Sequence, residues 1–96
     1  MRIKFLAGAS KEAKGARRWY EISVPGLGAV FQAEIDRSLR LIAEDPNRWR
    51  LVDRGVRRYN VRRFPYAILY RQTRDAIVVV AVMHQRRRPG YWKSRL

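Results

Sequence analysis

The sequence contains no cysteine and a single histidine, and its second half has only two acidic residues, Asp53 and Asp75. Without cysteine the chain can form neither a disulfide nor a thiolate metal site. One histidine and two scattered carboxylates do not make a ligand set, so we predict no metal and no other cofactor. The chain also lacks a glycine-rich phosphate loop and a serine in a nucleophile-elbow context. Metal-dependent hydrolysis, thiol chemistry and a serine triad are therefore not indicated.

Long apolar runs are also missing. The longest late in the chain is "IVVVAVM", Ile77–Met83, whereas a membrane-spanning helix needs about 20 apolar residues. The N-terminal stretch "MRIKFLAGAS" becomes polar too early for an export signal. We therefore expect a cytoplasmic protein with no membrane partner. A length of 96 residues predicts one domain, residues 1–96.

Positive charge is abundant and unevenly distributed. The chain has 22 Lys and Arg against 8 Asp and Glu, a net charge of +14. Residues 48–96 carry 14 basic and 2 acidic side chains, so almost all of the excess lies there, and 13 of these 14 are Arg. Because the planar guanidinium suits phosphate and carboxylate, this distribution predicts a polyanionic partner.

Hydrophobic periodicity predicts two helices and four strands. The predicted strands are 2–7, 56–64, 66–72 and 76–83, and the predicted helices are 10–22, with Ser10 as N-cap, and 27–44. The last strand is apolar at every position, which predicts a central strand covered on both faces. The expected fold is α+β: an N-terminal strand, a helical hairpin and a three-stranded antiparallel meander, with the helices packed on one face of a small sheet. We expect the other face to be partly open and to carry most of the arginines.

The stretch "HQRRRPGY" follows the apolar strand and has the residue types for cutting RNA without a metal. His84 or Tyr91 could transfer protons, and Arg86 and Arg87 could stabilise charge on the phosphorane. The alternative is a solvated strand end with no catalytic role.

The stretch "RWRLVDRGVRRYNVRR", residues 48–63, interleaves seven arginines with aromatic side chains. Guanidinium groups bind phosphate and rings stack on bases, so this pattern is typical of nucleic-acid binding. The alternative is a cationic surface that only maintains solubility. The predicted anion-binding or target-binding residues are Arg57, Arg58, Arg62, Arg63, Arg71 and Arg88.

Two adjacent aromatic residues, Trp19 and Tyr20, fall on the first predicted helix. Large rings on a helix most often pack in a core. The functional alternative is a groove for a helix of a partner protein.

Four segments together resemble the RelE/ParE superfamily of toxins from bacterial type II toxin–antitoxin modules. They are "WYE" in the first helix, "PGLGAVFQAEIDRSLRLIAEDP", "RRFPYAILYR" and "IVVVAVMHQRRRPGYW". The resemblance implies a cytoplasmic toxin held inactive by a cognate, partly disordered acidic antitoxin. We expect that antitoxin to contact Arg17, Trp19 and Tyr20.

Two activities occur in this superfamily, and the resemblance implies one of them for this chain. RelE-like members cut mRNA on the ribosome and usually carry an arginine where this sequence has Ala67, while their C-terminal tyrosine matches Tyr91. ParE-like members inhibit DNA gyrase. The missing arginine, the long helical hairpin and the "FPY" strand favour a ParE-like gyrase inhibitor. An mRNA endonuclease and a non-toxic nucleic-acid-binding module remain the alternatives, so whether the chain is an enzyme stays open.

Overall fold

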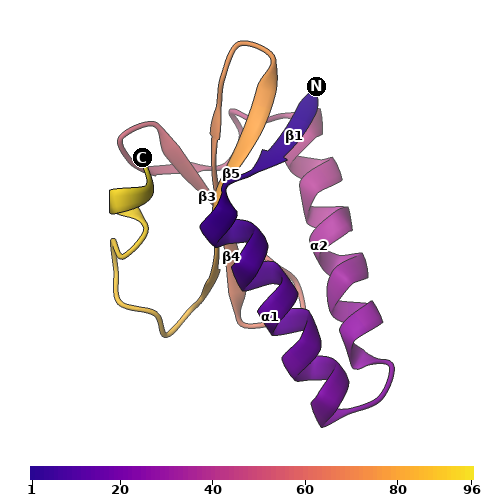
Figure 1. Cartoon of the computed structure of the whole chain (residues 1–96). Coiled ribbons are helices and arrows are strands. Elements are labelled where there is room, and N and C mark those ends of the chain that lie inside the picture. Colours follow the sequence, from indigo (N-terminus) through magenta and orange to yellow (C-terminus); the bar gives the residue numbers. More distant parts are fainter.

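The computed structural model describes residues 1–96 as a five-stranded sheet with two antiparallel helices against one face (Figure 1). The strands are β1 (Arg2–Phe5), β2 (Arg50–Asp53), β3 (Val56–Asn60), β4 (Tyr66–Gln72) and β5 (Ala76–His84). The helices are α1 (Ala7–Ser23) and α2 (Leu27–Glu44), and a short 3₁₀ turn, Lys93–Arg95, lies near the C-terminus. The strand order is β1-β5-β4-β3-β2, with β1 parallel to β5 and all other pairs antiparallel. This arrangement confirms the predicted α+β class and the meander.

Helix α1 begins earlier than predicted, and Ser10 is not its N-cap. The N-cap is Leu6, which makes no side-chain capping bond, and the backbone N–H of Ser10 donates to the carbonyl of Leu6. The N–H of Leu6 itself donates to the carbonyl of Val79 on β5 at 2.9 Å. The helix therefore starts where the chain leaves the sheet, and sheet pairing rather than a capping side chain fixes that point.

The turn between the helices is held by Glu21. Its two carboxylate oxygens accept hydrogen bonds from the N–H groups of Gly26 and Gly28 at 2.9 and 3.0 Å, which satisfies free donors at the start of α2. Gly26 has φ +90°, a conformation that side chains other than glycine rarely adopt. A Cβ at Gly28 would lie 2.8 Å from the carbonyl oxygen of Arg17, so this glycine allows the two helices to approach closely.

The sheet differs from the prediction at two places. Strand β2 was not predicted; it is a four-residue edge strand whose exposed apolar residues, Leu51 and Val52, follow no alternating pattern. Strand β3 ends at Asn60 instead of continuing to Phe64. There the chain turns through Arg63, whose φ of 72° is incompatible with an extended strand, and reaches Pro65, which cannot donate a ladder hydrogen bond.

Side chains pack on both faces of the sheet, and β5 is the central covered strand as predicted. On the helix face, Phe31, Ile35 and Ile42 of α2 pack with Ile68 and Tyr70 of β4. The second cluster lies on the opposite face and comprises Val56, Ala67, Leu69, Val80, Ala81, Met83 and Trp92.

Trp92 belongs to the segment after β5, which returns over the sheet face opposite the helices (Figure 1, yellow). The expectation that this face is partly open is therefore wrong where the C-terminal segment covers it. Neither α1 nor α2 combines the length and the apolar character that crossing a membrane would require.

Candidate functional site

Two arginine-bearing loops meet at one end of the sheet. The loop 61–65 joins β3 to β4, and the segment from Gln85 follows β5; the pairing of Tyr66 with His84 places them side by side. The N–H of Gln85 donates to the carbonyl of Pro65 at 2.9 Å, which ties the loops together. We call the five exposed arginines of these loops the strand-end surface: Arg62, Arg63, Arg86, Arg87 and Arg88. The structure's two ion pairs are Lys93 with Asp53 and Arg95 with Glu12, so all five guanidinium groups lack an acidic partner.

The single histidine stands at the edge of this surface. Its ring packs edge-on against Tyr66, with centroids 5.1 Å apart. Its Nδ1 accepts a hydrogen bond from the backbone N–H of Arg86 at 3.0 Å, so this arrangement requires the ring proton on Nε2. His84 therefore helps to fix the start of the arginine segment.

The hydroxyl of Tyr91 points inward to α1, while its ring contacts Arg87 of the strand-end surface. Its hydroxyl donates to Oε2 of Glu12 on α1 at 2.6 Å. The same carboxylate accepts two hydrogen bonds from the guanidinium of Arg95, at 2.9 and 3.0 Å, and one from the N–H of Val82 at 3.1 Å. We call these four residues the Glu12 network. It connects the first helix, the central strand and the C-terminal segment.

The Glu12 network also completes the hydrogen bonding of β5. Strand β1 pairs only with Ala76–Val79, so the rest of β5 has no neighbouring strand on that side. There Arg95 donates to the carbonyl of Val80 at 3.0 Å, and Glu12 accepts from Val82. A Cβ at Gly8 would lie 2.6 Å from Cζ of Arg95, so this glycine makes room for the guanidinium. The side chains of Glu12 and Arg95 thus take the hydrogen-bonding place that a longer β1 would occupy beside β5.

The environment of the network fixes the protonation states of its members. Burial alone would raise the pKa of Glu12, but the hydrogen bonds from Arg95, Tyr91 and Val82 outweigh it, and the pKa is lowered. Burial, together with the hydrogen bond to Glu12, raises the pKa of the Tyr91 phenol. Arg87 stacks over the Tyr91 ring at 4.0 Å. Tyr91 is therefore a protonated donor that holds the C-terminal segment, and its predicted role in RNA cleavage stays a prediction.

The other predicted anion-binding arginines lie apart from the strand-end surface. Arg57 faces the helix side and donates to the carbonyls of Asn47 and Trp49 at 3.2 and 2.8 Å. Arg58 lies on the opposite face, where its Nε donates to Asn60 at 3.0 Å. Arg71 stands near the far end of β4, five residues after Tyr66, where the strand starts beside the loops. The structure therefore brings together Arg62, Arg63 and Arg88 from this set, and not Arg57, Arg58 or Arg71.

The two aromatic residues of α1 have different surroundings. Tyr20 packs against Phe31, Phe64 and Tyr66, with ring centroids 5.3, 4.9 and 6.3 Å away, as the core alternative predicted. Trp19 is 63% exposed and borders a hollow of about 390 Å³ with Tyr66 and His84.

Ile22 and Val24 extend this apolar patch and are 73% and 53% exposed. We call Trp19, Ile22 and Val24 the hairpin tip. Ile22 and Val24 were not among the predicted site residues, although apolar residues at a helix break with no place in the helical stripe were a signal for exposure. The role of Glu12 was not predicted either, because the sequence carries no local signal for it.

No group of three or more His, Asp or Glu side chains lies close enough together to hold a metal ion. The arrangement at the strand ends is instead a set of unpaired guanidinium groups on two linked loops, beside an apolar patch. Such a surface is electrostatically complementary to an anionic macromolecule.

Comparisons with known proteins bear on the fold and on the family of the chain. A solved structure described as "Chromosomal ParDE TA system from P. aeruginosa" matches with a TM-score of 0.76 and 16% identity, over 88% of this chain and 95% of that chain. That likeness defines the fold class, an α+β fold shared with a protein of a toxin–antitoxin system. Residues 3–89 match the family described as "ParE toxin of type II toxin-antitoxin system, parDE". The chain therefore belongs to the ParE toxin family, and the predicted ParE-like grouping is confirmed. Among curated proteins none matches the sequence.

Proposed function

We propose that this toxin inhibits DNA gyrase in the cytoplasm by binding it through the strand-end surface, and that a cognate acidic antitoxin neutralises it. Family membership supports a toxin of this kind. The strand-end surface supplies five unpaired guanidinium groups for an anionic surface of the enzyme or of its bound DNA. Charge complementarity of this kind raises association rates and selects the partner.

Two observations favour binding over RNA cleavage. The Tyr91 hydroxyl donates a hydrogen bond to the Glu12 carboxylate at 2.6 Å. The raised pKa of this phenol also opposes proton transfer near neutral pH. The position where the nuclease pattern carries an arginine is Ala67, which is 0% exposed and packs in the second core cluster. The strand-end surface therefore offers exposed guanidinium groups for binding, whereas Tyr91 is not free to transfer a proton there.

The hairpin tip is the proposed antitoxin contact. Trp19, Ile22 and Val24 expose apolar area at the end of the helical hairpin, and Arg17 is an exposed cation on the same helix. An acidic segment with apolar residues at helical spacing would bury these side chains and pair with the arginine. Exposed tryptophan is a frequent centre of binding energy at such interfaces.

Charge reversal at the strand-end surface tests the gyrase proposal. The double variant Arg62→Glu/Arg86→Glu is expected to weaken inhibition of gyrase by roughly 100-fold, because like charges then face each other across the interface. The measurement is supercoiling of relaxed plasmid DNA by purified gyrase over a series of toxin concentrations.

The matched control for this experiment is Arg40→Glu/Arg74→Glu, which changes the net charge equally on exposed residues of α2 and of the β4–β5 turn. The control is expected to inhibit nearly as well as the unaltered toxin. Equal inhibition by all three proteins contradicts the proposed surface. Intact supercoiling together with cut mRNA in cells producing the unaltered toxin contradicts the gyrase target.

Truncation of the exposed tryptophan tests the antitoxin contact. Trp19→Ala is expected to weaken antitoxin binding by roughly 30-fold, the loss of about 2 kcal/mol typical of a central interface residue. Binding is measured by titration calorimetry with the product of the neighbouring antitoxin gene. The matched control is Leu51→Ala, which removes an apolar side chain of similar exposure, 56%, from edge strand β2. Unchanged affinity for Trp19→Ala, or an equal loss for both variants, contradicts the contact.

A further inference from the structure

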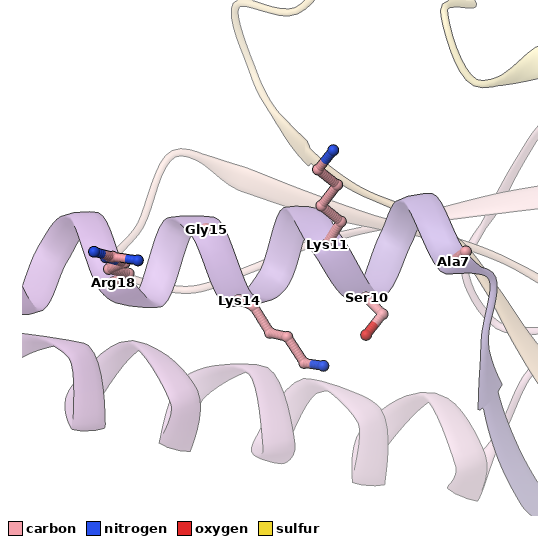
Figure 2. A pocket seen from close by; sticks show the side chains of 6 residues that line it. All are labelled: Ala7, Ser10, Lys11, Lys14, Gly15 and Arg18. Carbon is pink, nitrogen blue, oxygen red and sulfur yellow. The ribbon is translucent and has the colours of Figure 1, made fainter.

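The outer face of α1 carries a second cationic site, on the side of the helix that faces away from the sheet. A hollow of about 550 Å³ is lined by Ala7, Ser10, Lys11, Lys14, Gly15 and Arg18. We call these residues the α1 outer face. Figure 2 shows Lys11 extending from one side of the helix ribbon and Ser10 and Lys14 from the other, with Gly15 in the stretch between Lys11 and Arg18. The three cations therefore share this face of the helix with the small residues Ala7, Ser10 and Gly15.

These cations have no partner within the protein. The acidic residues of the two ion pairs, Asp53 and Glu12, are used by Lys93 and Arg95. Glu12 lies on α1 but faces the C-terminal segment, where three donors already occupy it. No acidic side chain lines the hollow. The positive charge of the outer face is thus available to a ligand.

No packing contact within the fold requires a glycine at position 15. It lies inside a helix, where glycine is less stable than alanine, and its φ is not in the left-handed region. A Cβ there would have no heavy atom within 4 Å, so no neighbouring element needs the space. The missing side chain leaves the helix surface open beside Lys11 and Arg18, which are the neighbours of Gly15 one helical turn before and after it.

The lining of the hollow selects the chemistry of that ligand. The lining side chains are three cations, one hydroxyl and two small residues, so an amphipathic helix of a protein partner would find no large apolar side chain to pack against. With a rise of 1.5 Å per residue, Lys11, Lys14 and Arg18 span about 10 Å along the helix. One DNA strand carries a phosphate about every 3.4 Å of helix axis, so this length matches roughly three phosphates.

We propose that the α1 outer face binds the phosphate backbone of duplex DNA independently of base sequence. Lys11, Lys14 and Arg18 neutralise phosphates, the Ser10 hydroxyl donates to a phosphate oxygen, and Gly15 lets the backbone approach the helix. The lysine ammonium groups are compact point charges that need no fixed base geometry, and contacts to phosphate carry no sequence information, so the binding is expected to be independent of sequence. The site goes beyond gyrase inhibition and does not depend on it, because it uses none of the strand-end arginines.

Neutralising substitutions distinguish DNA binding by the α1 outer face from non-specific attraction due to the net positive charge of the protein. The purified full chain is titrated onto a short labelled duplex of mixed sequence, and fluorescence anisotropy is followed over a range of salt concentrations. Lys11→Gln/Lys14→Gln is expected to lower affinity roughly 60-fold at about 0.1 M salt and to reduce the salt slope by about 2. The control Arg40→Gln/Arg74→Gln has the same net charge and is expected to lose only a few-fold. Equal losses in the two doubles overturn the proposal.

A substitution without any charge change gives a second test. Gly15→Leu is expected to raise the melting temperature, because leucine is the better helix former, and yet to weaken DNA binding at least fivefold by filling the floor of the hollow. Ala33→Leu adds the same side chain to an exposed position of α2 and is expected to bind normally. Unchanged binding by Gly15→Leu overturns the proposal. Polyglutamate that competes as strongly as DNA, with the same loss in the lysine double, also overturns it in favour of an acidic protein segment.

Discussion

Replacing Phe31 with alanine is expected to lower the free energy of unfolding by about 4 kcal/mol. Phe31 is 0% exposed, and its ring contacts Tyr20, Phe64 and Tyr66 at centroid distances of 5.1 to 5.3 Å. The substitution removes the transfer free energy of the ring, leaves a cavity and abolishes three aromatic contacts, which are each worth more than their area. The measurement is urea denaturation followed by circular dichroism.

The control for this prediction is Phe5→Ala. Phe5 lies on edge strand β1 and is 36% exposed, so the same truncation is expected to cost much less there. Domains of this size have stabilities of about 5–15 kcal/mol, so the Phe31 variant retains a measurable transition if the native protein is not at the lower end. A loss below about 2 kcal/mol would show that α2 is not packed on the strand-end loops through this aromatic cluster.

Removing the carboxylate of Glu12 is expected to cost about 3 kcal/mol and to release the C-terminal segment. Glu12→Ala leaves the guanidinium of Arg95, the hydroxyl of Tyr91 and the N–H of Val82 without their acceptor in a largely buried site. Denaturation gives the size of the loss. Hydrogen exchange locates it, because the Val82 amide is expected to lose protection before the rest of β5.

Two variants calibrate the Glu12 result. Tyr91→Phe removes one hydrogen bond and keeps the ring under Arg87, so a loss of about 1 kcal/mol is expected. Glu44→Ala removes an exposed carboxylate at the end of α2 and is expected to be nearly neutral. If Glu12→Ala is no worse than Glu44→Ala, the network does not hold the C-terminal segment.

The contribution of Glu12 to the free energy of unfolding is expected to depend on pH in one direction. The pKa of this carboxyl is lower in the folded protein than its ordinary value of 4.5. Its stabilisation is therefore complete above that value and is lost as the pH falls through the lowered, folded-state pKa. The hydrogen bond from Lys93 also lowers the pKa of Asp53, so this carboxyl contributes a pH dependence of the same sign. The difference in the free energy of unfolding between the native protein and Glu12→Gln removes the Asp53 contribution and isolates that of the network. That difference is expected to be constant near neutral pH and to shrink below about 4.5; growth in acid contradicts the assignment.

Local patterns in the sequence were sufficient for most of the fold. The i, i+4 spacing of Phe31, Ile35 and Leu39 specifies a helix with one apolar face whatever it packs against, and those residues are buried. The uniformly apolar Ile77–Met83 likewise required cover on both faces. The concentration of arginine in the second half was visible without coordinates, and it predicted a cationic surface at the end of β5.

Features that depend on distant residues were not accessible in this way. Glu12 and Tyr91 are 79 residues apart, and neither position carries a local pattern that indicates a bond between them. Edge strand β2 is short and follows no alternation, so only its pairing with β3 defines it. The arginines of β3 show the same limit. Strand alternation predicts that Arg57 and Arg58 lie on opposite faces of the sheet, but it does not predict that Arg57 donates hydrogen bonds to two backbone carbonyls.

The parallel pairing of β1 with β5 has a consequence for the toxin's synthesis. The first strand ends at Phe5 and its only neighbour begins at Ala76, so the ribosome must add about 70 further residues before β1 can join the sheet. At translation rates of about 5–20 residues per second, that interval lasts roughly 4 to 14 seconds. Arg95, which closes the last contact with Glu12, is added later still. Each new chain therefore lacks its complete sheet and the Glu12 network until synthesis is nearly finished.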